Sequence, residues 1–337
     1  MSVTGRMAAV FGCAGPVLLP EERDFFRAAD PLGFILFARN VEDPGQLARL
    51  TADLRDAVGR DAPVMIDQEG GRVQRMRAPH WREWEPPLDT ALRLGADAPR
   101  ALALRARLIA TELRAVGIDC NCAPVADIAG PLTHPFLRNR CYGEDVASVT
   151  RAARAVADAY LAAGVLPVMK HLPGHGRATA DSHQHLPTVT ASRAELAETD
   201  FAPFGALADL PMAMTAHIVF TAYDDQPATR SQTMIGVIRD QIGFQGLLLT
   251  DDLNMQALSG TLGQRAAAAR AAGCDIALHC KGVLAEMEEV AAEAGDMGPE
   301  TLARAGRALA RRQPPAAVDI AALEADLRGL LAARADG

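Results

Sequence analysis

The sequence predicts a single α/β domain of the TIM-type (β/α)8 barrel class. Short apolar runs alternate with amphipathic helical segments along most of the 337 residues, about eight such runs are present, and several end on a charged residue. Alternation of this kind is typical of a parallel sheet wrapped by helices, and eight parallel strands are the number that closes a barrel.

The expected strands are rich in Val, Ile, Leu, Met and Phe and are bounded by Gly, Pro or charged residues. They are AAVFGC near residue 8, GFILFAR near 33, PVMID ending at Asp67, DCNCAPVAD near 119, VLPVMKH ending at His171, PMAMTAH ending at His217, GLLLTD ending at Asp251 and CDIALHC near 274. Because a sequence pattern does not reveal strand order, a doubly wound open sheet is the second possibility.

Helical segments with recognisable start and stop signals lie between these runs. Asp43 and Pro44 precede QLARLTADLRDAV, Asp97 and Pro99 precede RALALRARLIATELRAV, Glu144 and Asp145 precede VASVTRAARAVADAYLAAG, and Gly117 and Gly164 stand where helices should stop. Two more helices, in PETLARAGRALARR and VDIAALEADLRGLLAARA, follow the last strand. We expect one domain over residues 1–337, with the barrel over about 5–295 and C-terminal helices over about 298–335.

Composition excludes several classes of protein. The chain is 49% hydrophobic and 23% charged, which is typical of a globular protein, and its net charge of -8 disfavours nucleic-acid binding. No window approaches the roughly 18 apolar residues that a membrane helix needs, and the apolar N-terminal stretch is interpreted as the first strand. We expect a soluble, cytoplasmic monomer.

The six cysteines are not spaced as CxxC pairs, and a chain of this length does not depend on disulfides. We expect free thiols. Cys120 and Cys122 alternate with Asp119 and Asn121 in a strand-like run, which favours core packing over a metal pair.

Charged residues at strand ends indicate where the chemistry lies, because a barrel carries its active site at the C-terminal ends of its strands. Four runs end in this way: on Asp67, on Lys170 with His171, on His217, and on Asp251 with Asp252. A single case is equally well explained by a solvated strand end, but four together favour a site. Adjacent residues of a strand point to opposite sides, so one aspartate of the last pair is expected to be catalytic. The other, Asp252, is a candidate cap for a helix starting near Leu253.

Residues 170–187, KHLPGHGRATADSHQHLP, hold four of the eight histidines in a segment that is expected to be a long loop. In Asp181-Ser182-His183 the carboxylate can hold one ring nitrogen and raise the basicity of the other; a solvated polar turn is the alternative. His171 and His175 have a zinc-like spacing, but Pro173 and Gly174 between them prevent the helix that such a site requires. We therefore expect no bound metal and no cofactor.

A third polar segment, DQEGGRVQR, follows the strand that ends on Asp67. A carboxylate that accepts hydrogen bonds, together with Arg72 and Arg75 as donors, suits a hydroxyl-rich ligand, although a local ion pair is the alternative. Asn139 and Arg140, expected in a loop after the fourth strand, are further candidate donors.

Together these segments resemble the single-domain β-N-acetylglucosaminidases of glycoside hydrolase family three that recycle peptidoglycan. The matching motifs occur in the family's order, and KHLPGHG followed closely by DSH is a highly specific combination. The motifs are IDQEGGRVQR at 66–75, NRCYGED at 139–145, KHLPGHG at 170–176, ADSH at 180–183, MTAHIVF at 214–220 and TDDLNM at 250–255. One departure is Leu172, where relatives commonly have phenylalanine.

The resemblance implies a retaining exo-glycosidase that removes terminal β-linked N-acetylglucosamine from peptidoglycan fragments, such as GlcNAc-1,6-anhydroMurNAc muropeptides. It implies that Asp251 is the nucleophile and that His183, oriented by Asp181, is the general acid and base. By the same match, residues of three motifs would hold the sugar hydroxyls and the N-acetyl group: Asp67, Arg75, Arg140, Lys170 and His171. With 4% aromatic residues, a pocket for a terminal sugar is expected in place of a long groove.

Three other functions stay open at this point. A phosphorylase that uses the same covalent intermediate is the nearest alternative, because a neutral histidine acid/base repels phosphate less than a carboxylate would. A metal-dependent barrel hydrolase would use the histidines as ligands. A non-catalytic protein would bind the sugar without turnover.

Overall fold

The computed structural model describes residues 3–179, 186–314 and 317–333. In this part of the chain an eight-stranded sheet runs in the order β10-β1-β2-β3-β4-β5-β7-β9, and every adjacent pair is parallel. A parallel bridge between Leu249 and Ile276 joins the two outer strands. The sheet is therefore a nearly closed barrel, which confirms the predicted fold class and rules out the open sheet.

All eight expected strands are present. They are β1 (Met7–Phe11), β2 (Pro31–Leu36), β3 (Val64–Ile66), β4 (Cys120–Asn121), β5 (Leu166–Leu172), β7 (Met212–Thr215), β9 (Leu247–Leu249) and β10 (Ala277–His279). A separate two-stranded sheet pairs β6 (Thr188–Val189) with β8 (Val219–Phe220). The expectation of a loop from residue 170 onward was wrong at its start, because β5 continues to Leu172.

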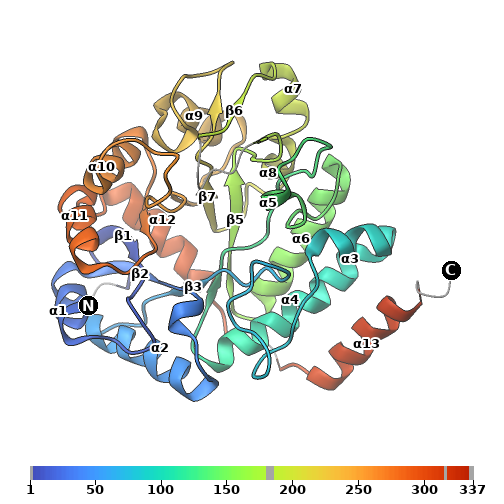
Figure 1. The fold of residues 1–337 in the computed structure, drawn as a ribbon, viewed down its shortest axis with the longest axis horizontal. Coiled ribbons are helices and arrows are strands. Elements are labelled where there is room, and N and C mark those ends of the chain that lie inside the picture. Colours follow the sequence, from blue (N-terminus) through green and yellow to red (C-terminus); the bar gives the residue numbers. More distant parts are fainter. Residues whose placement is uncertain (1–2, 180–185, 315–316, 334–337) are drawn as a thin grey trace.

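Helices surround the strands (Figure 1). In the first half of the chain they are α1 (Pro20–Ala29), α2 (Pro44–Val58), α3 (Pro87–Leu94), α4 (Ala98–Ala115), α5 (Pro135–Arg138) and α6 (Val146–Ala162). In the second half they are α7 (Arg193–Glu198), α8 (Ala202–Ala206), α9 (Gln232–Gly236), α10 (Leu262–Ala272), α11 (Leu284–Ala294), α12 (Pro299–Ala310) and α13 (Ile320–Ala332). Among the described helices, none has the length and apolar composition that a membrane crossing requires.

Two of the three predicted helix starts have the expected side-chain cap, whereas Asp97 makes no capping hydrogen bond at the start of α4. The side chain of Asp43 accepts a hydrogen bond from the amide of Gln46 at the start of α2, and Asp145 does the same for Ser148 at the start of α6. After α6 the chain turns at Gly164, whose φ of 74° lies in the region that glycine adopts without strain. The turn brings the chain directly into β5.

Two apolar layers hold the barrel together. Along β1, Ala8 and Val10 belong to the cluster inside the barrel, whereas Ala9 and Phe11 pack against the surrounding helices. Cys120 and Cys122 lie inside the barrel, and all six cysteines are buried and free, as predicted.

The two C-terminal helices differ in position, and α12 covers the end of the barrel where the strands begin. Ala308 and Leu309 of α12 join the interior cluster, and Arg312 donates to Asp119, just before β4. Helix α13 packs on α4 through Leu323 and Leu327 and lies at the periphery (Figure 1). The opposite end, where the strands finish, is the end that carries the pocket.

Candidate active site

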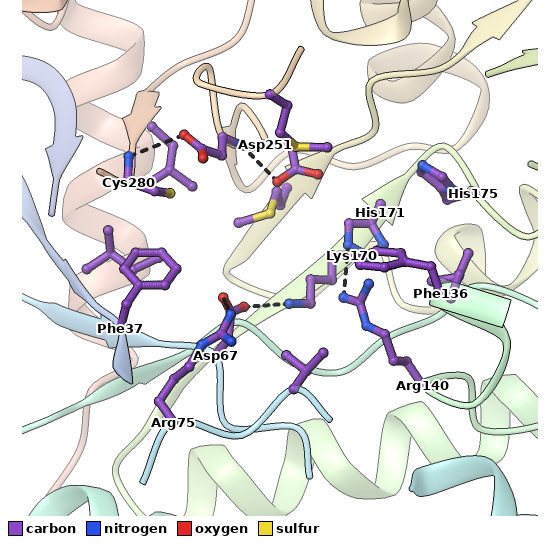
Figure 2. A pocket seen from close by; sticks show the side chains of 17 residues that line it. Phe37, Asp67, Arg75, Phe136, Arg140, Lys170, His171, His175, Asp251 and Cys280 are labelled. Carbon is purple, nitrogen blue, oxygen red and sulfur yellow. Dashed lines mark hydrogen bonds and ion pairs between the residues drawn. The ribbon is translucent and has the colours of Figure 1, made fainter. Parts of the chain in front are cut away.

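A pocket opens at the carboxyl ends of the strands (Figure 2). Its floor includes Ile35, Met214 and Leu278, which are side chains of the barrel interior, and Phe37 and Phe136 form parts of its wall. Six of the predicted site residues line it together: Asp67, Arg75, Arg140, Lys170, His171 and Asp251. Asp181 and His183, the predicted dyad, lie outside the described residues.

One side of the pocket is a row of alternating charges. Arg75 donates to Asp67 over 3.0 Å, and the ammonium of Lys170 lies 2.7 Å from both Asp67 and Glu69. Arg140 completes the row with two hydrogen bonds to Glu69, of 2.8 and 2.9 Å. Because the partners fix one another, the row presents its remaining donors and lone pairs in a rigid arrangement suited to sugar hydroxyls.

The charges in this row stabilise one another despite burial. Burial opposes ionisation of Glu69, but Arg140 and Lys170 hold the pKa of this carboxyl at about 2. Lys170 and Arg75 likewise hold the pKa of Asp67 below its ordinary value, against the effect of burial. At neutral pH both carboxylates are therefore charged, so they accept and do not donate hydrogen bonds.

Replacing Glu69 with Gln is expected to destabilise the protein by about 3 kcal/mol, because it leaves the buried Arg140 and Lys170 without their shared counter-charge. The depressed pKa of Glu69 means that the unfolded chain binds this proton more readily than the folded protein. The stability from Glu69 is therefore present above its ordinary pKa of 4.5 and is lost as the pH falls towards about 2.

Urea unfolding at neutral and acidic pH tests this expectation. Between pH 4.5 and about 2, the free energy of unfolding should fall more for wild type than for Glu69→Gln. The matched control is Glu83→Gln, which removes a half-exposed partner of Arg77 and should cost under about 1 kcal/mol. Equal effects of the two substitutions would contradict the account of the charged row.

The two adjacent aspartates differ in their surroundings. Burial opposes ionisation of Asp251, yet His217, His171, the Asp252 amide and Lys170 hold its pKa below the ordinary value. Among the described residues, the carboxylate of Asp251 accepts one hydrogen bond, of 2.8 Å from the amide of Asp252, and forms no salt bridge. Asp251 is thus a charged carboxylate in the pocket that no described cation neutralises directly.

Asp252 is fixed by backbone amides. Its Oδ1 accepts from the amides of Asn254 and Cys280, at 3.0 and 3.2 Å, and burial raises its pKa to about 6. The expectation that Asp252 caps a helix near Leu253 was wrong, because the chain continues in turns and α10 begins only at Leu262. Asp252 instead ties this turn to the end of β10.

His217 supports the chain just after Asp251 and does not itself line the pocket. Its Nε2 donates to the carbonyl of Asp252 over 3.0 Å, and its Nδ1 lies 2.8 Å from the hydroxyl of Thr229. Burial lowers the pKa of His217, which is consistent with a neutral ring that has both nitrogens engaged. Its position at a strand end therefore reflects support of Asp252 and not contact with the pocket.

The remaining predicted candidates, Arg72 and Asn139, do not line the pocket. Arg72 stacks on the ring of Phe136 at 3.7 Å and donates to its carbonyl. Asn139 follows the short helix α5, which the sequence did not predict, and its Oδ1 is buried without a hydrogen-bond partner in the described structure. Within the described ranges, no group of three or more His, Cys, Asp or Glu is placed to hold a metal ion.

Two buried carboxylates of the site were missing from the predicted set. Glu69 follows Asp67 by two residues and joins Lys170 to Arg140. Asp127 lies behind His171, with its Oδ2 2.7 Å from Nδ1 of that ring. The sequence pattern could have identified Asp127, because it ends the strand-like run DCNCAPVAD in the same way that Asp67 ends PVMID.

Comparison with known proteins agrees with this geometry. Residues 26–311 match the model of the glycosyl hydrolase family 3 N-terminal domain. The chain is 36% identical to a beta-hexosaminidase of Bordetella avium over 79% of this chain and 78% of the relative. It is 37% identical to a beta-hexosaminidase of Methylococcus capsulatus over 80% and 82% of the two chains.

A solved structure, NagZ from Neisseria gonorrhoeae in complex with N-trifluoroacetyl-D-glucosamine, superposes with a TM-score of 0.84 and 29% identity, covering 99% of this chain and 98% of that one. The barrel, its site and these likenesses show that the chain belongs to glycoside hydrolase family 3. Within that family it is a beta-hexosaminidase.

Proposed function

We propose that this enzyme removes terminal β-linked N-acetylglucosamine from peptidoglycan fragments in the cytoplasm, with retention of configuration at the anomeric carbon. The proposal rests on the carboxylate of Asp251, which lies across the pocket from the charged row and forms no salt bridge among the described residues. The ligand named for the Neisseria gonorrhoeae relative, an N-acylated glucosamine, supports the choice of sugar.

In the proposed reaction Asp251 attacks the anomeric carbon while His183 donates a proton to the departing oxygen. A covalent glycosyl-enzyme forms on Asp251. His183 then removes a proton from water, which displaces Asp251 from the sugar, and Asp181 orients the ring throughout. Two inversions at one carbon return the original configuration.

The charged row would hold the sugar during both steps. Asp67 keeps lone pairs available beyond those used by Lys170 and Arg75. Arg140 bonds to Glu69 through Nε and Nη2, so its Nη1 has no hydrogen-bond partner in the described part of the chain. Fixed donors and acceptors of this kind position a sugar hydroxyl without the cost of reorganisation at the moment of reaction.

Product analysis tests the proposal. NMR during turnover of a β-linked N-acetylglucosaminide should show the β anomer as the first sugar formed, with the same products in the presence and absence of phosphate. Initial release of the α anomer would contradict a covalent intermediate. Formation of the sugar 1-phosphate in phosphate buffer would assign the protein to the phosphorylases instead.

A further inference from the structure

The buried carboxylate of Asp127 holds two histidines of the pocket from behind. Its side chain is fully buried, and its Oδ2 lies 2.7 Å from Nδ1 of His171. Its Oδ1 accepts the backbone amide of His175 over 2.6 Å and lies 3.5 Å from the amide of His171. One carboxylate thus fixes the ring of His171 and the backbone on both sides of the turn after β5.

The partners of His171 determine which ring nitrogen carries the proton. A carboxylate accepts, so Nδ1 of His171 donates to Asp127. On the other side of the ring, Nε2 lies 3.4 Å from Nη2 of Arg140, and a guanidinium only donates. The lone pair of the imidazole is therefore on Nε2. The contact with Arg140 is long, which leaves this lone pair available to a closer donor.

His175 adds to the fixed position of the His171 ring. The two rings meet edge to face, with their centroids 5.7 Å apart, and both line the pocket. Burial lowers the pKa of His175 to about 4, so this neighbour is neutral at physiological pH. A neutral ring packed against His171 limits its rotation without adding a charge to the site.

We propose that Asp127 is a positioning residue, which locks His171 in the Nδ1–H tautomer so that its Nε2 accepts a hydrogen bond from one hydroxyl of the bound sugar. The proposal rests on the proposed function, which places a sugar against His171. Asp127 itself acts only through the ring and does not line the pocket.

The substitution Asp127→Asn tests this role because it changes one atom and reverses one hydrogen bond. The amide of His175 can only donate, so the asparagine oxygen is held there and its NH₂ group faces Nδ1 of His171. Nδ1 must then accept, and the proton moves to Nε2. The variant ring would present a donor to the sugar and to Arg140, where wild type presents an acceptor.

Nitrogen NMR of the histidine rings gives the first readout. We expect His171 of the wild type to be protonated on Nδ1 and unprotonated on Nε2. In Asp127→Asn we expect the reverse. The wild-type measurement stands even if the variant does not fold. An Nε2–H tautomer in wild type would overturn the proposal.

Kinetics with substrate analogues, each lacking one ring hydroxyl, gives the second readout. On the full substrate, kcat/KM of Asp127→Asn should fall by roughly 10- to 100-fold, the range expected for one buried hydrogen bond. For one analogue, kcat/KM of the wild type should fall to that of the variant, because this analogue lacks the hydroxyl that His171 contacts. Equal ratios of wild type to variant on every analogue would overturn the proposal.

The matched control is Asp119→Asn. Asp119 is equally buried, but it binds the amide of Val64 and Arg55 at the opposite end of the barrel. This control variant should be less stable than wild type. Its ratio of wild-type to variant kcat/KM should be the same on every analogue. Failure of the proposed function would look different, since wild type would not turn over the N-acetylglucosaminide while its His171 kept the Nδ1–H tautomer.

Discussion

Replacing Asp251 with Ala is expected to lower kcat by about 10⁴-fold or more while leaving the protein folded. The expected loss is large because we propose that this residue forms the covalent intermediate, and removal of a nucleophile has effects of this order in other covalent enzymes. The fold should survive because Asp251 accepts one backbone hydrogen bond and forms no salt bridge among the described residues. Steady-state kinetics, together with thermal unfolding, measures both parts.

The adjacent aspartate is the matched control. Asp252→Asn preserves an oxygen that can accept the amides of Asn254 and Cys280, so activity within about tenfold of wild type is expected. Turnover above about one per cent in a folded Asp251→Ala variant would overturn the assignment of the nucleophile. A larger loss in Asp252→Asn than in Asp251→Ala would exchange the roles of the two residues.

Replacing His183 with Ala is expected to have an effect that depends on the leaving group. An aryl glycoside releases a phenolate without protonation, so the variant should form the glycosyl-enzyme and then accumulate it, and added azide should restore turnover. A natural disaccharide needs the proton in the first step, and its turnover should fall by roughly 10²- to 10⁴-fold. Asp181→Asn should show a weaker form of the same pattern, because in the proposed mechanism that carboxylate acts only through the ring.

Equal losses on both substrates, with no effect of azide, would remove His183 from the proton-transfer role. The donor would then be sought at His171 or His175, which line the pocket. His217 is a poorer candidate, because its ring nitrogens already bond to the Thr229 hydroxyl and the Asp252 carbonyl.

The fold and most of the site were predictable because both depend on local pattern. Most strands of the barrel lie in short apolar runs, and the C-terminal ends of parallel strands meet at one end of the barrel. Asp67, Lys170, His171 and Asp251 therefore had to lie near one another once the barrel was inferred. The same rule applied to Asp127 would have placed it beside them.

Pairing between distant segments was not predictable in this way. Glu69 acquires its role from Arg140, 71 residues further along the chain, and no spacing rule connects the two. Asp252 was interpreted as a helix cap because capping is a local interaction. It does accept the nearby amide of Asn254, but no helix follows there, and its second partner amide belongs to Cys280, 28 residues away. Such contacts depend on which strands are neighbours, and the periodicity of a sequence does not reveal strand order.

We propose that Asp251 forms a covalent bond to the anomeric carbon of the sugar. The most direct measurement uses a slow, fluorinated N-acetylglucosamine analogue to trap the intermediate, followed by digestion and mass spectrometry of the peptides. We expect one adduct with the mass of the glycosyl group, located on Asp251. An adduct on Asp252 or on any other residue, or no adduct while the analogue is being turned over, would contradict it.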